Sequence, residues 1–434
     1  MVLLLIILAC LLWLIYIRNK GDILNPALMF CASFVFSSIW AAAYVDTWDI
    51  NICTATFFVI FGGVVLFFVT NRIINSIYRH AHKKRIYEAK YIHVDRWKMI
   101  LIIFLSAISC IWVIRLLLNN GLGSTLSIAM HEYRLSVVNN PDELPFNTPR
   151  VLTYLRSFAL ASSYWFAYIL ANNIVNSKKK ISIDNLLMIA IIALGIISAC
   201  LYGGRQQFIN VLLAFFGSLL YCNRKIKGTD KTISFKTLLL VILGSAIALY
   251  AFKNLSGLVG KEIDSISFTA YIAKYCGAPI KNLDSFLRRT NYSKASELWG
   301  FQTFRRMYEW FGYDLPQRDF PFQYYNGFNI GNAYTTFYDM IYDFGFAGMA
   351  ILVIVMSILV SWLYYAICNR TSSDKKIILC AIWGFQLPNI LLSFFSDEFY
   401  EFTFSRSFAR YLLGWIVLYI LCNKIKFRVR KAKR

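Results

Sequence analysis

Long apolar segments constrain this chain more than any other feature of its sequence. A helix that crosses a membrane needs about 20 mostly apolar residues, and the 434 residues contain eleven candidate segments. They cover residues 1–17, 24–44, 52–70, 99–118, 151–175, 186–202, 208–222, 237–252, 345–367, 377–395 and 411–422. Because the first has neither a basic start nor a small-x-small cleavage site, we expect it to be retained as a span.

Composition agrees with a membrane protein and argues against a soluble enzyme. The chain is 58% hydrophobic and 16% charged, whereas soluble proteins average about 25% charged residues. The pattern predicts an all-α polytopic membrane protein with about 11 transmembrane helices, in which residues 1–434 form a single membrane domain. The sequence contains no internal repeat and no second, soluble domain.

The basic residues predict which loops face the cytoplasm, because Lys and Arg accumulate on that side. One alternating topology places 28 of the 45 Lys and Arg inside, but only 6 of the 23 Asp and Glu. The net charge of +22 is therefore a topology signal and does not indicate a nucleic-acid partner. The N-terminus is then outside and the C-terminus cytoplasmic. The inside segments are 18–23, 71–98, 176–185, 223–236, 368–376 and 423–434.

Two long segments, 119–150 and 253–344, face outside in this topology, and we expect them to carry the functional site. The second is too apolar for a flexible linker and predicts interfacial or re-entrant helix. Its apolar residues include Ile263, Ile266, Phe268, Ile272 and Tyr275. A tight outside turn, Tyr202-Gly203-Gly204-Arg205-Gln206, joins two spans, and a short outside loop covers 396–410.

Arginine is the main basic residue of the outside segments, with 12 Arg to 5 Lys against 10 Arg to 18 Lys inside. Its planar fork binds phosphate or carboxylate through two hydrogen bonds, which suits an anionic ligand. Alternatively, most of these arginines pair with outside acids or reach lipid headgroups. Arg115 and Arg156 favour a ligand because they lie inside apolar spans, where charge is costly. Arg205 follows two glycines that allow a sharp turn, and Arg406 and Arg410 share one helix face.

Candidate acids and bases also lie outside. His131 is the only outside histidine, and in a helix it would share a face with Arg134. Its ordinary pKa near 6.5 suits a general base, although a solvated interfacial histidine explains it equally well. The acids of interest are Asp339, Asp343, Asp397, Glu398 and Glu401. For most of these the simpler interpretation is pairing with a nearby arginine.

Aromatic side chains are dense between residues 291 and 345, where 18 of 55 residues are Phe, Tyr or Trp. Some belong to the membrane-interface belt, and others present flat faces on which sugars stack. The sequence has no Walker A motif, dinucleotide fingerprint, HExxH or GxSxG elbow. It also has no Asp-x-Asp pair, so we expect no metal and no cofactor.

With these features the chain resembles the O-antigen (oligosaccharide repeat-unit) polymerases of the Wzy type, which are bacterial inner-membrane proteins with ten to fourteen spans. The resemblance is one of architecture over nearly the whole chain. It includes the Gly203-Gly204-Arg205 turn and a long outside loop that runs into Gly331-Asn332-Ala333-Tyr334-Thr335-Thr336 before a span. Arg289 and Gly300 match a family spacing of Arg and Gly with ten residues between them. The first large outside loop departs from that pattern, because Arg134 lacks the corresponding Gly.

The resemblance implies a glycosyltransferase with a GT-C-like helical fold in the bacterial plasma membrane. A glycan on undecaprenyl pyrophosphate would be transferred to the hydroxyl of a new lipid-linked repeat unit, and the lipid pyrophosphate would leave. We expect Arg134, Arg205, Arg289 and Arg305 to contact the pyrophosphate, with Arg115 and Arg156 at the lipid entrance. The expected base is His131, with Glu398 in reserve. Asp339, Arg406 and Arg410 complete the expected substrate-binding set.

Two other functions fit the sequence. An O-antigen-type ligase uses the same lipid donor with a different acceptor. A lipid-linked sugar flippase would need charged residues across the bilayer midplane and usually internal repeats, neither of which the sequence favours. Membrane lipid and a chain-length regulator are further possible partners of a polymerase.

Overall fold

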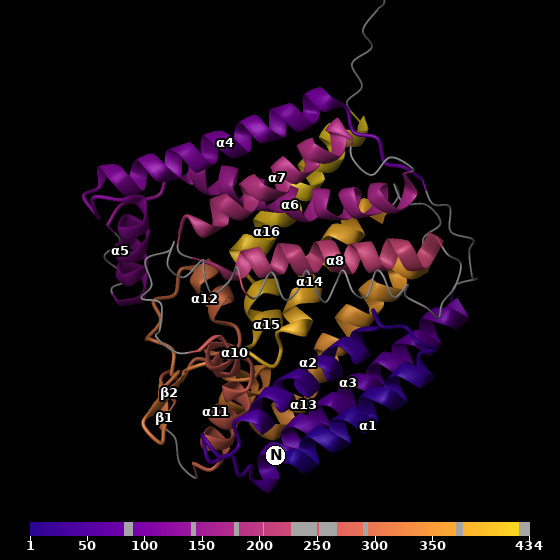
Figure 1. Cartoon of the computed structure of the whole chain (residues 1–434), viewed down its shortest axis with the longest axis vertical. Helices are drawn as coiled ribbons and strands as arrows, with labels where there is room; N and C mark the ends of the chain where they lie inside the picture. The colour runs from indigo at the N-terminus through magenta and orange to yellow at the C-terminus, as the bar shows by residue number, and fades with distance from the viewer. Residues whose placement is uncertain are drawn as a thin grey trace, which may run out of the picture.

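The computed structural model describes residues 1–81, 90–139, 145–177, 182–202, 204–226, 250, 267–289, 294–369 and 376–424. Over these residues the chain is helical apart from loops and one short antiparallel hairpin (Figure 1). The long helices are α1 (Val2–Arg18), α2 (Pro26–Ala43), α3 (Thr54–Ala81), α4 (Arg96–Asn119), α6 (Arg150–Asn176), α7 (Ile183–Cys200), α8 (Gln206–Ile226), α13 (Thr336–Asn369), α14 (Ile377–Leu391) and α16 (Arg406–Tyr419), which continues as a π-helix (Ile420–Lys424). The shorter elements are α5 (Leu126–Asn139), α10 (Phe268–Cys276), α11 (Ala278–Leu287), α12 (Arg305–Phe311), α15 (Glu398–Thr403), β1 (Gln323–Tyr325) and β2 (Phe328–Gly331).

The long helices occupy ten of the eleven predicted spans, and most of the remaining one, 237–252, lies outside the described residues. Five of them, α2, α3, α4, α7 and α13, are long and apolar enough to cross a membrane, while α1 and α14 are apolar but shorter. This indicates a multi-pass membrane protein of the all-α class. The total of eleven spans stays a prediction.

Helix α6 is less apolar than a lipid-facing helix because protein surrounds it. Residues 159–173 are all buried, and α6 packs against α4, α7, α8, α14 and α16. A side chain at Gly195 of α7 would collide with Ser163 Oγ and the carbonyl of Ala159, so this glycine allows the two helices to approach closely. Polar residues of α6 are bonded within the bundle: Ser163 Oγ donates to the carbonyl of Ile192 at 3.1 Å.

The helices α1, α2, α3 and α13 form one group of the bundle, and α4, α6, α7 and α16 form another, with α8 and α14 between them (Figure 1). Predicted inside segments contact one another at one end, as Arg96 does with Asp184 at 2.6 Å and Arg224 with Asp22. The short elements α5, α10, α11, α12 and the hairpin gather at the other end, at the left of Figure 1. We call this the outer end, following the charge distribution.

Helix α13 begins nine residues before the predicted span at 345. The two agree at Gly345, whose φ of 66° interrupts the helical backbone at that residue. A positive φ is readily adopted only by glycine. The break separates an arm, which begins at Thr336 and carries Asp339 and Asp343, from the apolar part of the helix. Helix α16 likewise begins at Arg406, five residues before the predicted span.

The predicted long loop 253–344 contains ordered structure over its described part. Helix α10 includes Phe268, Ile272 and Tyr275, as the apolar pattern predicts, whereas Ile263 and Ile266 lie outside the described residues. Helix α11 is fastened to the bundle through Asp284, which accepts hydrogen bonds from the Cys53 amide at 2.7 Å and Thr56 Oγ1 at 2.8 Å. These contacts hold α11 against the start of α3 at the outer end.

Candidate functional site

The turn between α7 and α8 places Arg205 inside the outer end. Gly203 lies outside the described residues, but Gly204 and Arg205 are described. Arg205 is only 6% exposed, and its Nη1 donates to Tyr271 Oη of α10 at 3.2 Å. The ring of Tyr271 lies 4.9 Å from that of Tyr275, one helical turn further along. The turn is therefore anchored against two tyrosines.

A second arginine reaches the same place from α5. Burial lowers the pKa of Arg134, and the positive charge of Arg205 lowers it further, while Tyr275 and Tyr271 act in the opposite direction. Arg134 Nη1 is buried and has no hydrogen-bond partner among the described residues. Two neighbouring guanidinium groups repel each other, so an anion between them would be stabilised.

Arg156 of α6 adjoins Tyr202, the first residue of the turn. Its guanidinium carbon is 3.3 Å from the centre of the Tyr202 ring, a close cation–π contact. Its Nε is buried and lacks a partner among the described residues. The ionisable groups that act on Arg156 are Tyr202, Tyr411, Tyr133 and Arg410. An ionisable residue near the end of a buried helix is a candidate for function.

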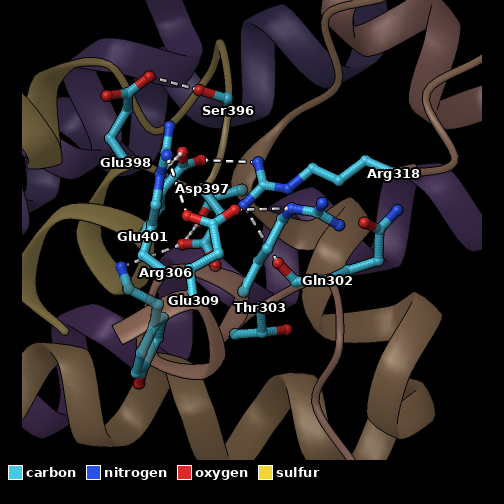
Figure 2. Close-up of polar contacts among 12 residues, drawn as sticks. Gln302, Thr303, Arg306, Glu309, Arg318, Ser396, Asp397, Glu398 and Glu401 are labelled. Atoms are coloured by element: carbon cyan, nitrogen blue, oxygen red, sulfur yellow. Dashed lines mark hydrogen bonds and ion pairs between the residues drawn. The ribbon is translucent and has the colours of Figure 1, made fainter. Parts of the chain in front are cut away.

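Glu398 joins this region to the last outside loop. The side chain is buried, with 3% exposure of the residue. It accepts hydrogen bonds from Gln206 Nε2 and from Ser396 Oγ (Figure 2). Burial raises the pKa of Glu398 to about 7, even though the hydrogen bonds from Ser396 and Gln206 lower it. Because Gln206 follows Arg205 directly, one turn holds both the arginine and the carboxylate.

An ion-pair network lies beside Glu398, centred on Glu401 of α15 (Figure 2). Glu401 accepts from Arg318 Nη1 at 2.7 Å and from Arg306 Nε at 3.0 Å. Arg306 also pairs with Glu309 at 3.1 Å. Burial raises the pKa of Glu401, but Arg318 and Arg306 outweigh it and lower the value to about 2. These charges neutralise one another and tie the long outer segment to α15.

Two buried aspartates lie behind the network. Asp397 Oδ1 accepts from Thr336 Oγ1 at 3.1 Å, whereas its Oδ2 is buried without a partner among the described residues. Asp339 Oδ1 is likewise buried and unpartnered there. Burial raises the pKa of Asp397, and the nearby charge of Asp339 raises it further. Asp343 differs, because it accepts from the backbone amides of Gln302 and Thr303 at 3.2 and 2.7 Å.

Of the residues predicted from sequence, the structure brings Arg134, Arg205 and Glu398 to one turn, with Arg156 and Arg410 beside it. His131 lies on α5, one turn before Arg134, and its Nδ1 is buried without a partner among the described residues.

Four predicted arginines are placed differently. Arg115 is exposed in a groove built from α4 alone, and Arg289 is exposed at the end of α11. Arg305 pairs with Glu309 at 3.0 Å and donates to the carbonyl of Pro316 at 2.6 Å. Arg406 is exposed and donates to the carbonyl of Trp310 at 2.7 Å.

Sequence reasoning did not single out Tyr271 or Gln206. Tyr271 and Tyr275 are four residues apart in an apolar run, a spacing that places both on one helix face. Their apolar neighbours made them resemble core residues. Gln206 adjoins Arg205, so its position in the turn was the available indication.

Comparison with known proteins finds no matching family model, no matching curated protein and no matching solved structure. The function therefore rests on the chemistry of the outer end.

Proposed function

We propose that this protein is a glycosyltransferase that polymerises oligosaccharide repeat units carried on undecaprenyl pyrophosphate, at the outer leaflet of a bacterial plasma membrane. The observation that carries the proposal is the meeting of Arg134 and Arg205 with the buried Glu398 at one turn. The arginines suit an anionic leaving group, and the carboxylate suits a hydroxyl that must lose a proton.

In the proposed reaction the acceptor hydroxyl attacks the anomeric carbon of the donor glycan. A new bond forms between this oxygen and the anomeric carbon, and the bond from that carbon to the pyrophosphate oxygen breaks. The hydroxyl proton passes to Glu398, and undecaprenyl pyrophosphate leaves as an anion. Arg134 and Arg205 stabilise the charge that develops on the leaving group, and preorganised donors of this kind contribute about 3–4 kcal/mol each.

Glu398 replaces His131 as the preferred base in this proposal. A general base works best when its pKa lies near the operating pH, and burial brings the pKa of Glu398 to about 7. Glu398 also bonds to Gln206, next to the proposed leaving-group site, whereas His131 is one turn from Arg134 on α5. His131 stays the second candidate.

The experiment that tests the function compares the surface polysaccharide of cells with and without the gene. Loss of a polymerase reduces a ladder of chain lengths to single repeats on the acceptor. Loss of all capped acceptor would instead indicate a ligase, and retention of the lipid-linked unit on the cytoplasmic side would indicate a flippase. An unchanged ladder would reject all three for that glycan.

A purified reaction makes the test direct. The protein in lipid nanodiscs, supplied only with the lipid-linked repeat unit, should produce chains of two or more units. Arg150→Ala is the matched control, because Arg150 is an exposed arginine at the start of α6 that the proposal does not use. Product formed by Arg150→Ala but not by Arg205→Ala would support the assignment.

A further inference from the structure

Four outer arginines that are partly or fully buried and are not in the Glu401 network fall into two groups. Arg134 and Arg205 form the first, between α5, α10 and the α7–α8 turn. Arg156 and Arg410 form the second, where α6 packs against α16. Arg205 bonds to Tyr271 of α10, whereas Arg156 lies over the ring of Tyr202 on a helix that packs against α16, the helix of Arg410. The grouping suggests two sites rather than one.

A cluster of aromatic rings adjoins the second group. Arg156 covers one face of Tyr202, and the ring of Tyr133 meets Tyr202 edge to face at 5.0 Å. Tyr133 is stacked in turn on Phe146 at 5.0 Å. Because successive residues of a helix point about 100° apart, Tyr133 can belong to this cluster while its neighbour Arg134 faces the first group.

No described acid pairs with the second group. The ion pairs of the described outer end involve Arg288, Arg305, Arg306 and Arg318, and neither Arg156 nor Arg410 is among them. Arg156 Nε is also buried and unpartnered over the described part of the chain. Two positive charges held together in a partly buried place are costly unless an anion joins them.

The second group lies at the outer edge of a tight helix crossing. One turn deeper, Trp415 Nε1 donates to the carbonyl of Ala161 at 2.9 Å, and a side chain at Gly414 would approach the Ala161 methyl to 3.0 Å. Tyr154, two residues before Arg156, is 59% exposed. A ligand can therefore reach the two arginines from the surface of the bundle but cannot pass between the helices below them.

We propose that the two groups bind the pyrophosphates of two different lipids at the same time, the donor at Arg134 and Arg205 and the acceptor at Arg156 and Arg410. The assignment of donor and acceptor rests on the proposed function, since only the first group adjoins Glu398. The acceptor hydroxyl lies at the sugar end of its repeat unit, away from its own pyrophosphate. The two pyrophosphates must then be held apart, and the two groups contact different parts of the outer end: Arg205 bonds to Tyr271 of α10, whereas Arg156 contacts Tyr202.

The test counts bound lipids by native mass spectrometry, with undecaprenyl pyrophosphate as the probe. We expect the wild-type protein to bind two molecules at saturation. Arg410→Ala should bind one and retain the other with unchanged affinity, and Arg205→Ala should show the same single occupancy. Arg150→Ala should bind two. Saturation of the wild type at one molecule, or an unchanged count in Arg410→Ala, would overturn the proposal.

Arg410→Ala is preferred to a change at Arg156, because Arg410 is partly exposed and its loss is less disruptive to packing. Arg410→Lys keeps the charge, so it should regain the second lipid with weaker affinity. In the polymerisation assay Arg410→Ala should raise the KM for the acceptor about tenfold and leave the KM for a preformed polymer donor unchanged.

The two proposals can fail separately. Two bound lipids without polymerisation would retain the paired sites and reject the polymerase function. Polymerisation with one bound lipid, or with both KM values raised equally by Arg410→Ala, would retain the function and reject the second site.

Discussion

Two arginine-rich regions meet at the outer end, and their charges are arranged in opposite ways. Around Glu401, each arginine has a carboxylate at 2.7–3.1 Å and the charges nearly cancel. Around Tyr202, Arg156 contacts a ring and the charge that acts on it is another arginine. The first region is complete without a ligand, whereas the second gains stability from an added anion.

This difference separates two roles that look alike in a sequence. Both regions are rich in arginine and tyrosine or phenylalanine, and both lie at the outer end. Removing a charge from the paired region should act mainly on folding, because it leaves its partners uncompensated. Removing one from the unpaired region should not weaken folding, because the repulsion between the arginines decreases. The main effect should then be on ligand binding and on the reaction rate.

The largest expected effect comes from Arg205. Arg205→Ala should lower kcat/KM for polymerisation by about 100- to 1000-fold, the usual cost of one donor to a developing anion. The thermal unfolding midpoint in detergent should change little. Arg205→Lys should also be poorly active, because an ammonium group cannot bind two oxygens in the plane of a guanidinium. Activity close to that of Arg150→Ala would contradict the role of Arg205.

The next effect tests Glu398 as the base. Glu398→Gln should lower the rate about 100-fold, while binding of the lipid probe persists. The rate of the wild type should rise with pH through about 7, where Glu398 loses its proton. The stability of the fold should change in the opposite direction to the rate. Glu398 keeps its proton to a higher pH in the folded protein, with a pKa of about 7, than in the unfolded chain, with a pKa of about 4.5. The free energy of unfolding should therefore decrease as pH rises from about 4.5 to 7.

A control for this assignment is His131→Gln. If His131 were the base, this variant would lose the rise near pH 7 and Glu398→Gln would keep it. If Glu398 is the base, Glu398→Gln loses the rise in rate and His131→Gln keeps it.

A change at Glu401 should affect the stability of the fold more than the reaction rate. Glu401→Gln leaves Arg306 and Arg318 without their shared carboxylate, which should destabilise the fold by about 1–3 kcal/mol, since Arg306 is half exposed and screened by water. Folded Glu401→Gln should retain more than a third of the wild-type rate. The wild type should lose this stabilisation as pH falls from about 4.5 to about 2, where Glu401 takes up a proton. An unfolding midpoint unchanged by the substitution would show that the network does not support the fold.

The helices and their ends were the predictable part of this molecule. Apolar length alone located α2, α4 and α7 to within a few residues, because each must match the same bilayer thickness. It also located the start of α3, although that helix continues to Ala81, past the predicted end at residue 70. Charge then indicated which loops lie together, as the Arg96–Asp184 pair illustrates. Both properties depend on composition within a short window of sequence.

The partners of individual side chains were not predictable in this way. Arg305 and Arg205 look equivalent as outside arginines, yet Arg305 pairs with Glu309 one turn away and Arg205 bonds to Tyr271, 66 residues later in the chain. The acid that Arg318 and Arg306 share, Glu401, comes from α15, which follows two intervening spans. Such pairings depend on how the helices assemble, and one sequence carries no direct record of them.

The smallest expected effect concerns Arg289, whose spacing from Gly300 contributed to the family resemblance. Gly300 has a local reason to be glycine: its φ is 70°, and a side chain there would collide with Phe304 and Phe344. Arg289 is exposed at the end of α11, where water screens its charge. Arg289→Ala should therefore change the polymerisation rate less than twofold, measured beside Arg205→Ala in the same nanodiscs. A loss as large as that of Arg205→Ala would mean that the long outer segment closes onto the lipid during the reaction and brings a third arginine to the pyrophosphate.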